Sequence, residues 1–202
     1  IMYQAATWMF DAVSDSSQIF NSPTGLRSLN EKVGTLLFPE QAKGGLVTSS
    51  TERLMSFLFE ECDGDGIIKP LDMFGGVGVQ RVRSSLMRRK LIENVLHKAT
   101  QSGKIPLIMQ RFDEEVYCGE VRAFALGGEV LAWCLKKPLK GEFLANTSAG
   151  ATLHSFQPSA ALKSRVNEVS KKLLSMGIAF VGFDIIGELI TEINVTSPRL
   201  LQ

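Results

Sequence analysis

The sequence predicts a globular protein of the α/β or α+β class, because strand-like and helix-like segments alternate along its 202 residues. Near the C-terminus, the apolar runs 178–186 and 189–195 are typical of two neighbouring strands. A glycine pair at 127–128 separates two further strand-like runs, which predicts a hairpin. Between these pairs, Pro158 stands where a helix begins and Gly177 stands where it ends.

The other elements follow from local signals in the sequence. Apolar spacing and capping residues predict the helices, and short apolar or β-branched runs predict the strands. In chain order we expect a helix over 2–13, a strand over 18–21, a helix over 26–38, a strand over 46–48, a helix from Ser49 or Ser50 to about Glu61, strands over 66–70 and 77–82, a helix over 86–102, a strand over 105–110, and hairpin strands over 121–126 and 129–136. Residues 138–157 show little periodicity and are expected to form a long loop, and loops of that length are usually functional or disordered.

Composition excludes several classes of partner. The net charge of +1 implies no general attraction to nucleic acid or to acidic membranes. No apolar run approaches the roughly 20 residues of a membrane span. The three cysteines are odd in number and form no C-x-x-C, so we expect free thiols in a reducing, cytoplasmic compartment. Homo-oligomers are compatible with the sequence.

An acidic pair near the C-terminus is the most informative local feature. If the loop between the last two strands is 187–189, Asp184 lies opposite Glu192 and Asn194 shares their face. A two-residue loop would instead put Thr191 opposite Asp184. Two carboxylates and an amide oxygen suit Mg²⁺, which takes oxygen ligands. The alternative is that one carboxylate faces solvent or pairs with a lysine.

Basic residues and glycines mark a candidate anion site. Lys69 lies inside a strand, where it needs an anionic partner such as a phosphate unless it snorkels from an edge. The glycine-bearing run 71–78 could fold its backbone over phosphates or form a plain turn, and it is neither a Walker A loop nor a dinucleotide fingerprint. Arg122 and the lysine pair 136–137 either line the same site or form a solvated strand face.

Taken in order, several segments resemble bacterial glutathione synthetase, a family of ATP-grasp carboxylate–amine ligases. The segments are 21–32, 67–72 with Gly75 and Gly76, 180–187, and 191–198, and the likeness covers essentially the whole chain. The resemblance implies an α+β ATP-grasp fold in which two α/β subdomains with antiparallel sheets sandwich the nucleotide. It also implies three regions: residues 1–29 as the tail of an absent N-terminal domain, 30–111 as a small lid subdomain, and 112–202 as a large catalytic subdomain.

The resemblance further implies an activity and a set of site residues. The activity is an ATP- and Mg²⁺-dependent joining of γ-glutamylcysteine and glycine through an acyl phosphate, with Mn²⁺ as an alternative metal. Small molecules would be the partners, without nucleic acid or membrane. The implied roles are catalysis for Arg122 and Lys137; nucleotide binding for Lys32, Lys69, Asp72, Gly75, Gly76, Gln110 and Glu120; metal binding for Asp184, Glu192 and Asn194; and substrate binding for Asn146, Thr196 and Ser197.

Three positions depart from the family pattern. Met73 follows Asp72 where the family has glycine, Lys137 stands where it has arginine, and residues 149–152 lack the arginine of its large loop. Lysine keeps the charge of arginine but loses its two-pronged geometry. Two alternatives therefore stand beside the glutathione activity: an ATP-grasp ligase for another acid and amine, or a non-catalytic nucleotide-binding protein.

Overall fold

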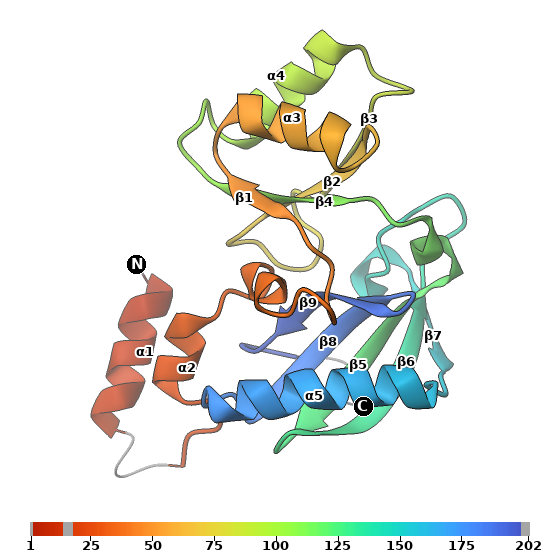
Figure 1. Cartoon of the computed structure of the whole chain (residues 1–202). Coiled ribbons are helices and arrows are strands. Elements are labelled where there is room, and N and C mark those ends of the chain that lie inside the picture. The colour runs from red at the N-terminus through yellow and green to blue at the C-terminus, as the bar shows by residue number, and fades with distance from the viewer. Residues whose placement is uncertain (1, 14–17, 199–202) are drawn as a thin grey trace.

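The chain builds two antiparallel sheets that lie one above the other, each covered by helices on its outer face (Figure 1). The structure is a computed structural model, and it describes residues 2–13 and 18–198. Positions 1, 14–17 and 199–202, which belong to the first and last predicted regions, lie outside the described residues. Antiparallel sheets with separate helices make this an α+β fold, as the sequence predicted.

The smaller sheet has four strands in the order β1-β4-β2-β3. Its strands are β1 (Leu46–Thr48), β2 (Asp65–Pro70), β3 (Gln80–Arg83) and β4 (Leu107–Arg111). Helices α3 (Thr51–Glu60) and α4 (Arg89–Ala99) pack on one face of this sheet around a core that includes Leu58, Ile68 and Met109. Because side chains alternate along a strand, the neighbours of Ile68 and Met109 face the other sheet.

The larger sheet has five strands in the order β7-β6-β5-β8-β9. Its strands are β5 (Glu120–Leu126), β6 (Glu129–Lys137), β7 (Thr152–Ser155), β8 (Phe180–Ile186) and β9 (Leu189–Asn194). Helix α5 (Ala160–Ser175) covers the outer face, and Leu162, Val166 and Leu173 on this helix join the core beneath it (Figure 1). The inner face of the sheet is left for polar side chains.

The N-terminal segment packs on the side of the larger sheet. It comprises α1 (Met2–Val13), α2 (Pro23–Ser28) and the 3₁₀ turn η1 (Val33–Leu37); two further 3₁₀ turns are η2 (Glu114–Cys118) and η3 (Thr147–Ala149). Leu29, Phe38 and Ala42 belong to the core of the larger sheet. The first part of the expected lid region therefore rests on the larger sheet, while the strands and helices from Leu46 to Arg111 form the smaller one.

Two predicted elements near the N-terminus are wrong. Residues 18–21 form no strand, because Asn21 adopts a left-handed backbone with φ 64° and its side chain binds Phe180 and Val195 instead. The helix expected over 26–38 breaks at an extended Leu29. The Asn30 side chain then accepts hydrogen bonds from the backbone of Lys32 and Val33 and begins η1.

Other boundaries shift by a few residues. The strand expected over 77–82 begins only at Gln80, because 75–78 form a turn. The expected loop 138–157 contains a short turn and a fifth strand, β7, which pairs with β6. The remaining predicted helices and strands, including the hairpin across the glycine pair at 127–128, are present.

Two β-bulges set the register of the larger sheet. The turn between β8 and β9 has two residues, since Ile186 pairs with Leu189, so it is the shorter of the two loops considered from the sequence. A bulge at Thr191 restores the pairing of Asp184 with Glu192. A second bulge lies in β6 and puts Lys136 opposite Glu120. Each bulge advances its strand by one residue and so exchanges the two faces beyond it.

The described residues include no helix with the length and apolar content of a membrane span. All three cysteines are free thiols, as expected. Cys62 is buried in the core of the smaller sheet, Cys134 is half-buried, and Cys118 is exposed. Burial raises the pKa of the Cys62 thiol to about 11.

We predict that alkylation at about pH 8 modifies Cys118 first and Cys62 last, because only an accessible thiolate reacts. Timed iodoacetamide labelling with peptide mass spectrometry measures the order. Labelling in denaturant is the control and should remove most of the difference. Equal rates for Cys62 and Cys118 in the folded protein would contradict the described core.

Candidate functional site

A cavity of about 770 Å³ lies between the two sheets and receives side chains from both of them. This volume falls within the usual range for small-molecule sites. The smaller sheet contributes Ile67, Lys69 and Gln110, and the larger sheet contributes its charged inner face. Loop residues 71–77 and 143–148 close the sides.

The structure brings nearly all of the sequence-predicted site residues to this cavity. Those that line it are Lys32, Lys69, Asp72, Gly75, Gly76, Gln110, Glu120, Arg122, Asn146, Asp184, Glu192, Asn194, Thr196 and Ser197. Lys137 is the exception: its side chain is exposed and does not line the cavity. The preceding residue, Lys136, is buried and takes the place expected for a basic residue of β6.

A row of charged side chains crosses the inner face of the larger sheet. Arg122 on β5 pairs with Asp184 on β8, and Asp184 pairs with Glu192 on β9. Glu120 lies two residues before Arg122 on the same face and pairs with Lys136 on β6. Four neighbouring strands therefore place acidic and basic groups in contact at the floor of the cavity.

Asp184 is the centre of this row and is held by four hydrogen bonds. Arg122 donates from Nε to Oδ1 at 2.8 Å and from Nη2 to Oδ2 at 2.9 Å. The Lys136 ammonium donates to Oδ1 at 2.6 Å, and the Asn194 amide donates to Oδ2 at 3.0 Å. A carboxylate offers about four lone-pair positions, so these donors fill Asp184.

The pKa values of the charged groups in this row reflect their pairing. Burial alone would raise the pKa of Asp184, but Lys136 and Arg122 outweigh it and hold that pKa well below its usual range. Burial opposes the charge of Lys136 too, yet Asp184 and Glu120 raise its pKa. Glu120 differs: burial, with the nearby charge of Asp184, raises its pKa to about 7 despite an ion pair with Lys136.

Sequence reasoning offered the lysine pair 136–137 as a possible lining of the site, and the resemblance then selected Lys137 and not Lys136, because the β6 bulge cannot be read from the hairpin pattern. A regular ladder from Leu126 paired with Glu129 would bring Leu135 opposite Glu120 and leave Lys136 on the other face. The usable signal was chemical: a lysine on the inner face satisfies Glu120, whereas a leucine cannot.

Two polar side chains of the smaller sheet line the cavity. The side-chain ammonium of Lys69 on β2 makes no hydrogen bond or ion pair with the residues that the structure describes, and burial lowers its pKa. Gln110 on β4 is buried, and its amide donates to the Lys43 carbonyl at 3.1 Å. Lys69 is therefore the cation of the cavity that most needs an external anion.

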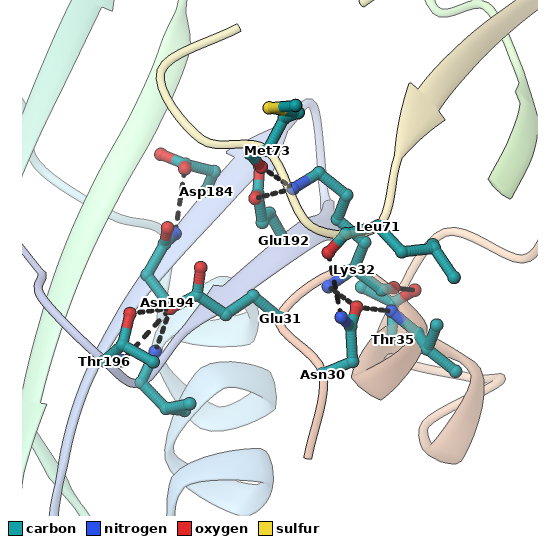
Figure 2. A network of polar contacts seen from close by, with 12 residues as sticks. Asn30, Glu31, Lys32, Thr35, Leu71, Met73, Asp184, Glu192, Asn194 and Thr196 are labelled. Carbon is teal, nitrogen blue, oxygen red and sulfur yellow. Dashed lines mark hydrogen bonds and ion pairs between the residues drawn. The ribbon is translucent and has the colours of Figure 1, made fainter. Parts of the chain in front are cut away.

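The segment 30–32 connects the glycine-bearing loop to the larger sheet (Figure 2). The Lys32 ammonium donates to the Met73 carbonyl at 2.6 Å and lies 3.3 Å from Glu192. Asn30 donates to the Leu71 carbonyl at 2.9 Å. This segment thus fixes the start of the loop above the acidic end of the row.

Glycines in the loop allow close contact with the opposite wall. Gly75 and Gly76 have positive φ values of 65° and 80°. A Cβ on Gly76 would lie 2.5 Å from the Asn146 amide nitrogen, so a side chain there would collide. Met73 has its backbone held by Lys32 and an exposed side chain, so the departure from glycine at this position is accommodated.

Glu31 holds the end of β9 beside the cavity (Figure 2). One of its carboxylate oxygens accepts hydrogen bonds from the backbone N–H groups of Val195 and Thr196, each at 3.0 Å, and from the Thr196 hydroxyl at 2.8 Å. Thr196 and Ser197, the predicted substrate residues, are thereby positioned at the rim.

The predicted metal ligands fit a divalent cation only in part. Glu192 has a partly exposed carboxylate whose ion pair to Lys32 leaves room for another ligand. The side-chain oxygen Oδ1 of Asn194 accepts no hydrogen bond from the described side chains or backbone. Asp184 has no free lone pair while its four donors are in place. Within the described residues, no group of three or more His, Cys, Asp or Glu side chains gathers as a metal site.

Comparison with known proteins identifies the family of this chain. The family described as "Prokaryotic glutathione synthetase, ATP-grasp domain" matches residues 31–202. The chain belongs to this family. It is 35% identical over 202 residues to a glutathione synthetase of Vibrio parahaemolyticus and 32% identical over 197 residues to one of Parasynechococcus marenigrum, covering 99% and 97% of this chain. The chain spans 62% of the length of each of these two relatives.

Solved structures share the fold at low sequence identity. The D-cycloserine synthetase DcsG superposes with a TM-score of 0.72 and 14% identity, over 96% of this chain and 71% of that one. The D-alanine–D-alanine ligase of Bacillus anthracis gives 0.65 and 11%, over 94% and 63%. The ATP-grasp ligase PsnB, solved with Mg and ADP, gives 0.65 and 16%, over 98% and 59%. The expected α+β ATP-grasp fold is confirmed.

We predict that Glu31→Ala destabilises the protein by about 1–3 kcal/mol, because the Val195 N–H and the Thr196 groups lose their acceptor. Denaturant unfolding measures the free-energy change. Glu40→Ala, at an exposed residue nearby, is the control and should stay within about 0.5 kcal/mol of wild type. Equal stability of the two variants would show that the Glu31 clamp contributes nothing.

Proposed function

We propose that this chain carries the ATP site of a carboxylate–amine ligase that joins γ-glutamylcysteine to glycine and gives glutathione, ADP and phosphate. The observation that carries the proposal is the convergence of Lys32, Lys69, Arg122 and Lys136 on one cavity between the two sheets. Such a cluster suits the phosphates of a nucleotide. Membership of the glutathione synthetase family supports the choice of reaction.

The proposed binding mode follows the two walls of the cavity. Lys69 and Lys32 hold the phosphates, and the backbone of 75–76 approaches them closely. Gln110 lies at the adenine edge, and Glu120 lies near the ribose. Asp72 lies at the mouth of the loop. These assignments place the nucleotide between the sheets and its γ-phosphate above the charged row.

The proposed chemistry has two steps. The cysteinyl carboxylate of γ-glutamylcysteine attacks the γ-phosphorus of ATP, so that ADP leaves and an acyl phosphate forms. The glycine amine then attacks the acyl carbon and loses a proton, and inorganic phosphate leaves with the electrons of the broken C–O bond. Arg122 stabilises the phosphoryl oxygens through its remaining N–H groups, while Asn146, Thr196 and Ser197 hold the acid and the amine. Such catalysis is mainly positioning and charge neutralisation.

Water must be kept from the acyl phosphate, which it would hydrolyse. The loops that line the cavity over 71–77 and 143–148 are the candidates for this role, because they meet at Gly76 and Asn146. Lys137, which the resemblance places in catalysis, would have to act from outside the cavity. We therefore assign no step to it.

A divalent ion, proposed to be Mg²⁺ with Mn²⁺ as an alternative, supplies charge neutralisation of the phosphates when bound. Glu192 and the Asn194 carbonyl oxygen are the groups open to it. The proposed reaction needs ATP, so we also propose a cytoplasmic location. Self-association into a homo-oligomer stays a prediction.

Two other functions compete with this proposal. The exposed Met73 side chain and the absence of arginine from residues 149–152 favour a ligase for a different acid and amine. The saturated Asp184 carboxylate favours a protein that binds nucleotide without turning it over.

The test is to incubate the purified chain with ATP, Mg²⁺, γ-glutamylcysteine and glycine and to identify products by mass spectrometry. Glutathione with stoichiometric ADP is the expected result. ADP without glutathione would overturn the choice of substrates and favour another acid and amine. Bound ATP without ADP would favour the non-catalytic function, and no nucleotide binding by calorimetry would overturn the site itself.

We predict that Glu192→Gln abolishes the gain in ATP affinity that Mg²⁺ provides, because the amide carries no charge for the cation. Isothermal titration with and without Mg²⁺ measures this gain. Glu129→Gln, at an exposed residue of β6, is the control and should behave as wild type. An unchanged Mg²⁺ effect in Glu192→Gln would remove Glu192 from the metal site.

A further inference from the structure

We propose that the Lys136 ammonium is a built-in cation that takes the place of a divalent metal at Asp184 and binds the nucleotide phosphate directly. The inference rests on the proposed nucleotide site. It concerns the one carboxylate of the predicted metal set that the structure closes to a metal.

The first argument is the coordination of Asp184. Its Oδ1 accepts from Arg122 at 2.8 Å and from Lys136 at 2.6 Å, and its Oδ2 accepts from Arg122 at 2.9 Å and from Asn194 at 3.0 Å. A metal ion at this carboxylate needs a lone pair that these donors occupy. A metal ion that displaced Arg122 would break two charge-assisted hydrogen bonds at once, whereas one that displaced Lys136 from Asp184 would break a single one. Lys136 therefore occupies the place on Asp184 that a metal ion would most easily take.

The second argument is the balance of charge. Lys136 contacts both Glu120 and Asp184, Arg122 contacts Asp184, and Lys32 contacts Glu192. Three carboxylates thus meet three cations before any ion is added. An acidic cluster that is already neutralised attracts a divalent cation far less than a bare pair of carboxylates does.

The third argument is the free donor of Lys136. An ammonium group has three N–H donors, and Lys136 uses two of them for Glu120 and Asp184. The residue is 2% exposed and lines the cavity, so its third donor is available to a ligand there and not to bulk water. Lys69, which has no partner among the described groups, adds a further positive charge on the opposite wall. A phosphate group in this cavity is attracted by both ammonium groups.

The test compares Lys136→Met with wild type by isothermal titration of ADP, once in EDTA and once in excess Mg²⁺. We expect wild type to bind ADP in EDTA and the variant to bind it at least about tenfold more weakly, as for the loss of one charge-assisted contact. Mg²⁺ should bring the variant back to within about threefold of wild type, because Oδ1 of Asp184 is then free for the metal. Lys140→Met, at an exposed lysine that does not line the cavity, is the matched control.

Lys136→Arg guards against a variant that does not fold. It keeps a cation at Asp184 and Glu120, and it should retain ADP binding in EDTA better than Lys136→Met. Equal affinities of wild type and Lys136→Met in EDTA would overturn the proposal, as would a deficit that Mg²⁺ leaves unchanged. If wild type binds ADP only with Mg²⁺, this inference fails while the proposed function stands. If wild type binds ADP under neither condition, the proposed function fails.

Discussion

The buried carboxylate of Asp184 is the group on which the arrangement of the site depends. A charge at that depth is tolerated only with partners, and removing one partner from such a group is strongly destabilising. Its partners come from three different strands: Arg122 from β5, Lys136 from β6 and Asn194 from β9. The hydrogen bonds of Asp184 therefore fix the lateral order of these side chains on the inner face of the larger sheet, while α5 and the apolar core hold the outer face.

The smaller sheet and the N-terminal segment complete the site from the other side. Lys69 faces the cavity because Ile68, its neighbour on β2, is buried beneath α3 and α4. The break at Leu29 and Asn30 turns Glu31 and Lys32 towards the end of β9 and the glycine-bearing loop. One short segment thus contacts both walls, so the spacing between the acidic row and the loop above it depends on a few hydrogen bonds.

Much of the fold could be predicted from the sequence, because periodic apolar patterns and glycine or proline punctuation act locally. The errors arise where side chains replaced backbone pairing. The Asn21 amide binds Phe180 on β8 and Val195 just after β9, and the Asn30 side chain begins η1 after the break at Leu29. Neither effect has a periodic signature. In the site, Asp184 lies opposite Glu192 as expected, but a bulge and not a longer loop produces the pairing. The bulge in β6 likewise brings Lys136 to the cavity in place of the expected Lys137. The register beyond a bulge depends on which side chains find partners, and the hairpin pattern does not show this.

The bulges also constrain how this chain can vary; the extra residue is Leu131 in β6, between the paired residues Val130 and Ala132, and Thr191 in β9. Leu131 is largely exposed and Thr191 is buried, with its hydroxyl donating to the Asp184 carbonyl at 3.2 Å. If either strand kept all its residues but paired without its bulge, the rest of that strand would turn over by half a period. Lys136, or Glu192 with Asn194, would then point into the apolar layer under α5, and leucine or isoleucine would point into the cavity. Deletion of the bulge residue itself would leave Lys136 opposite Glu120 and Glu192 opposite Asp184, whereas one residue inserted between a bulge and the charged row would turn the row over. Homologous chains should therefore accept insertions in the turns but not between the bulges and the charged row.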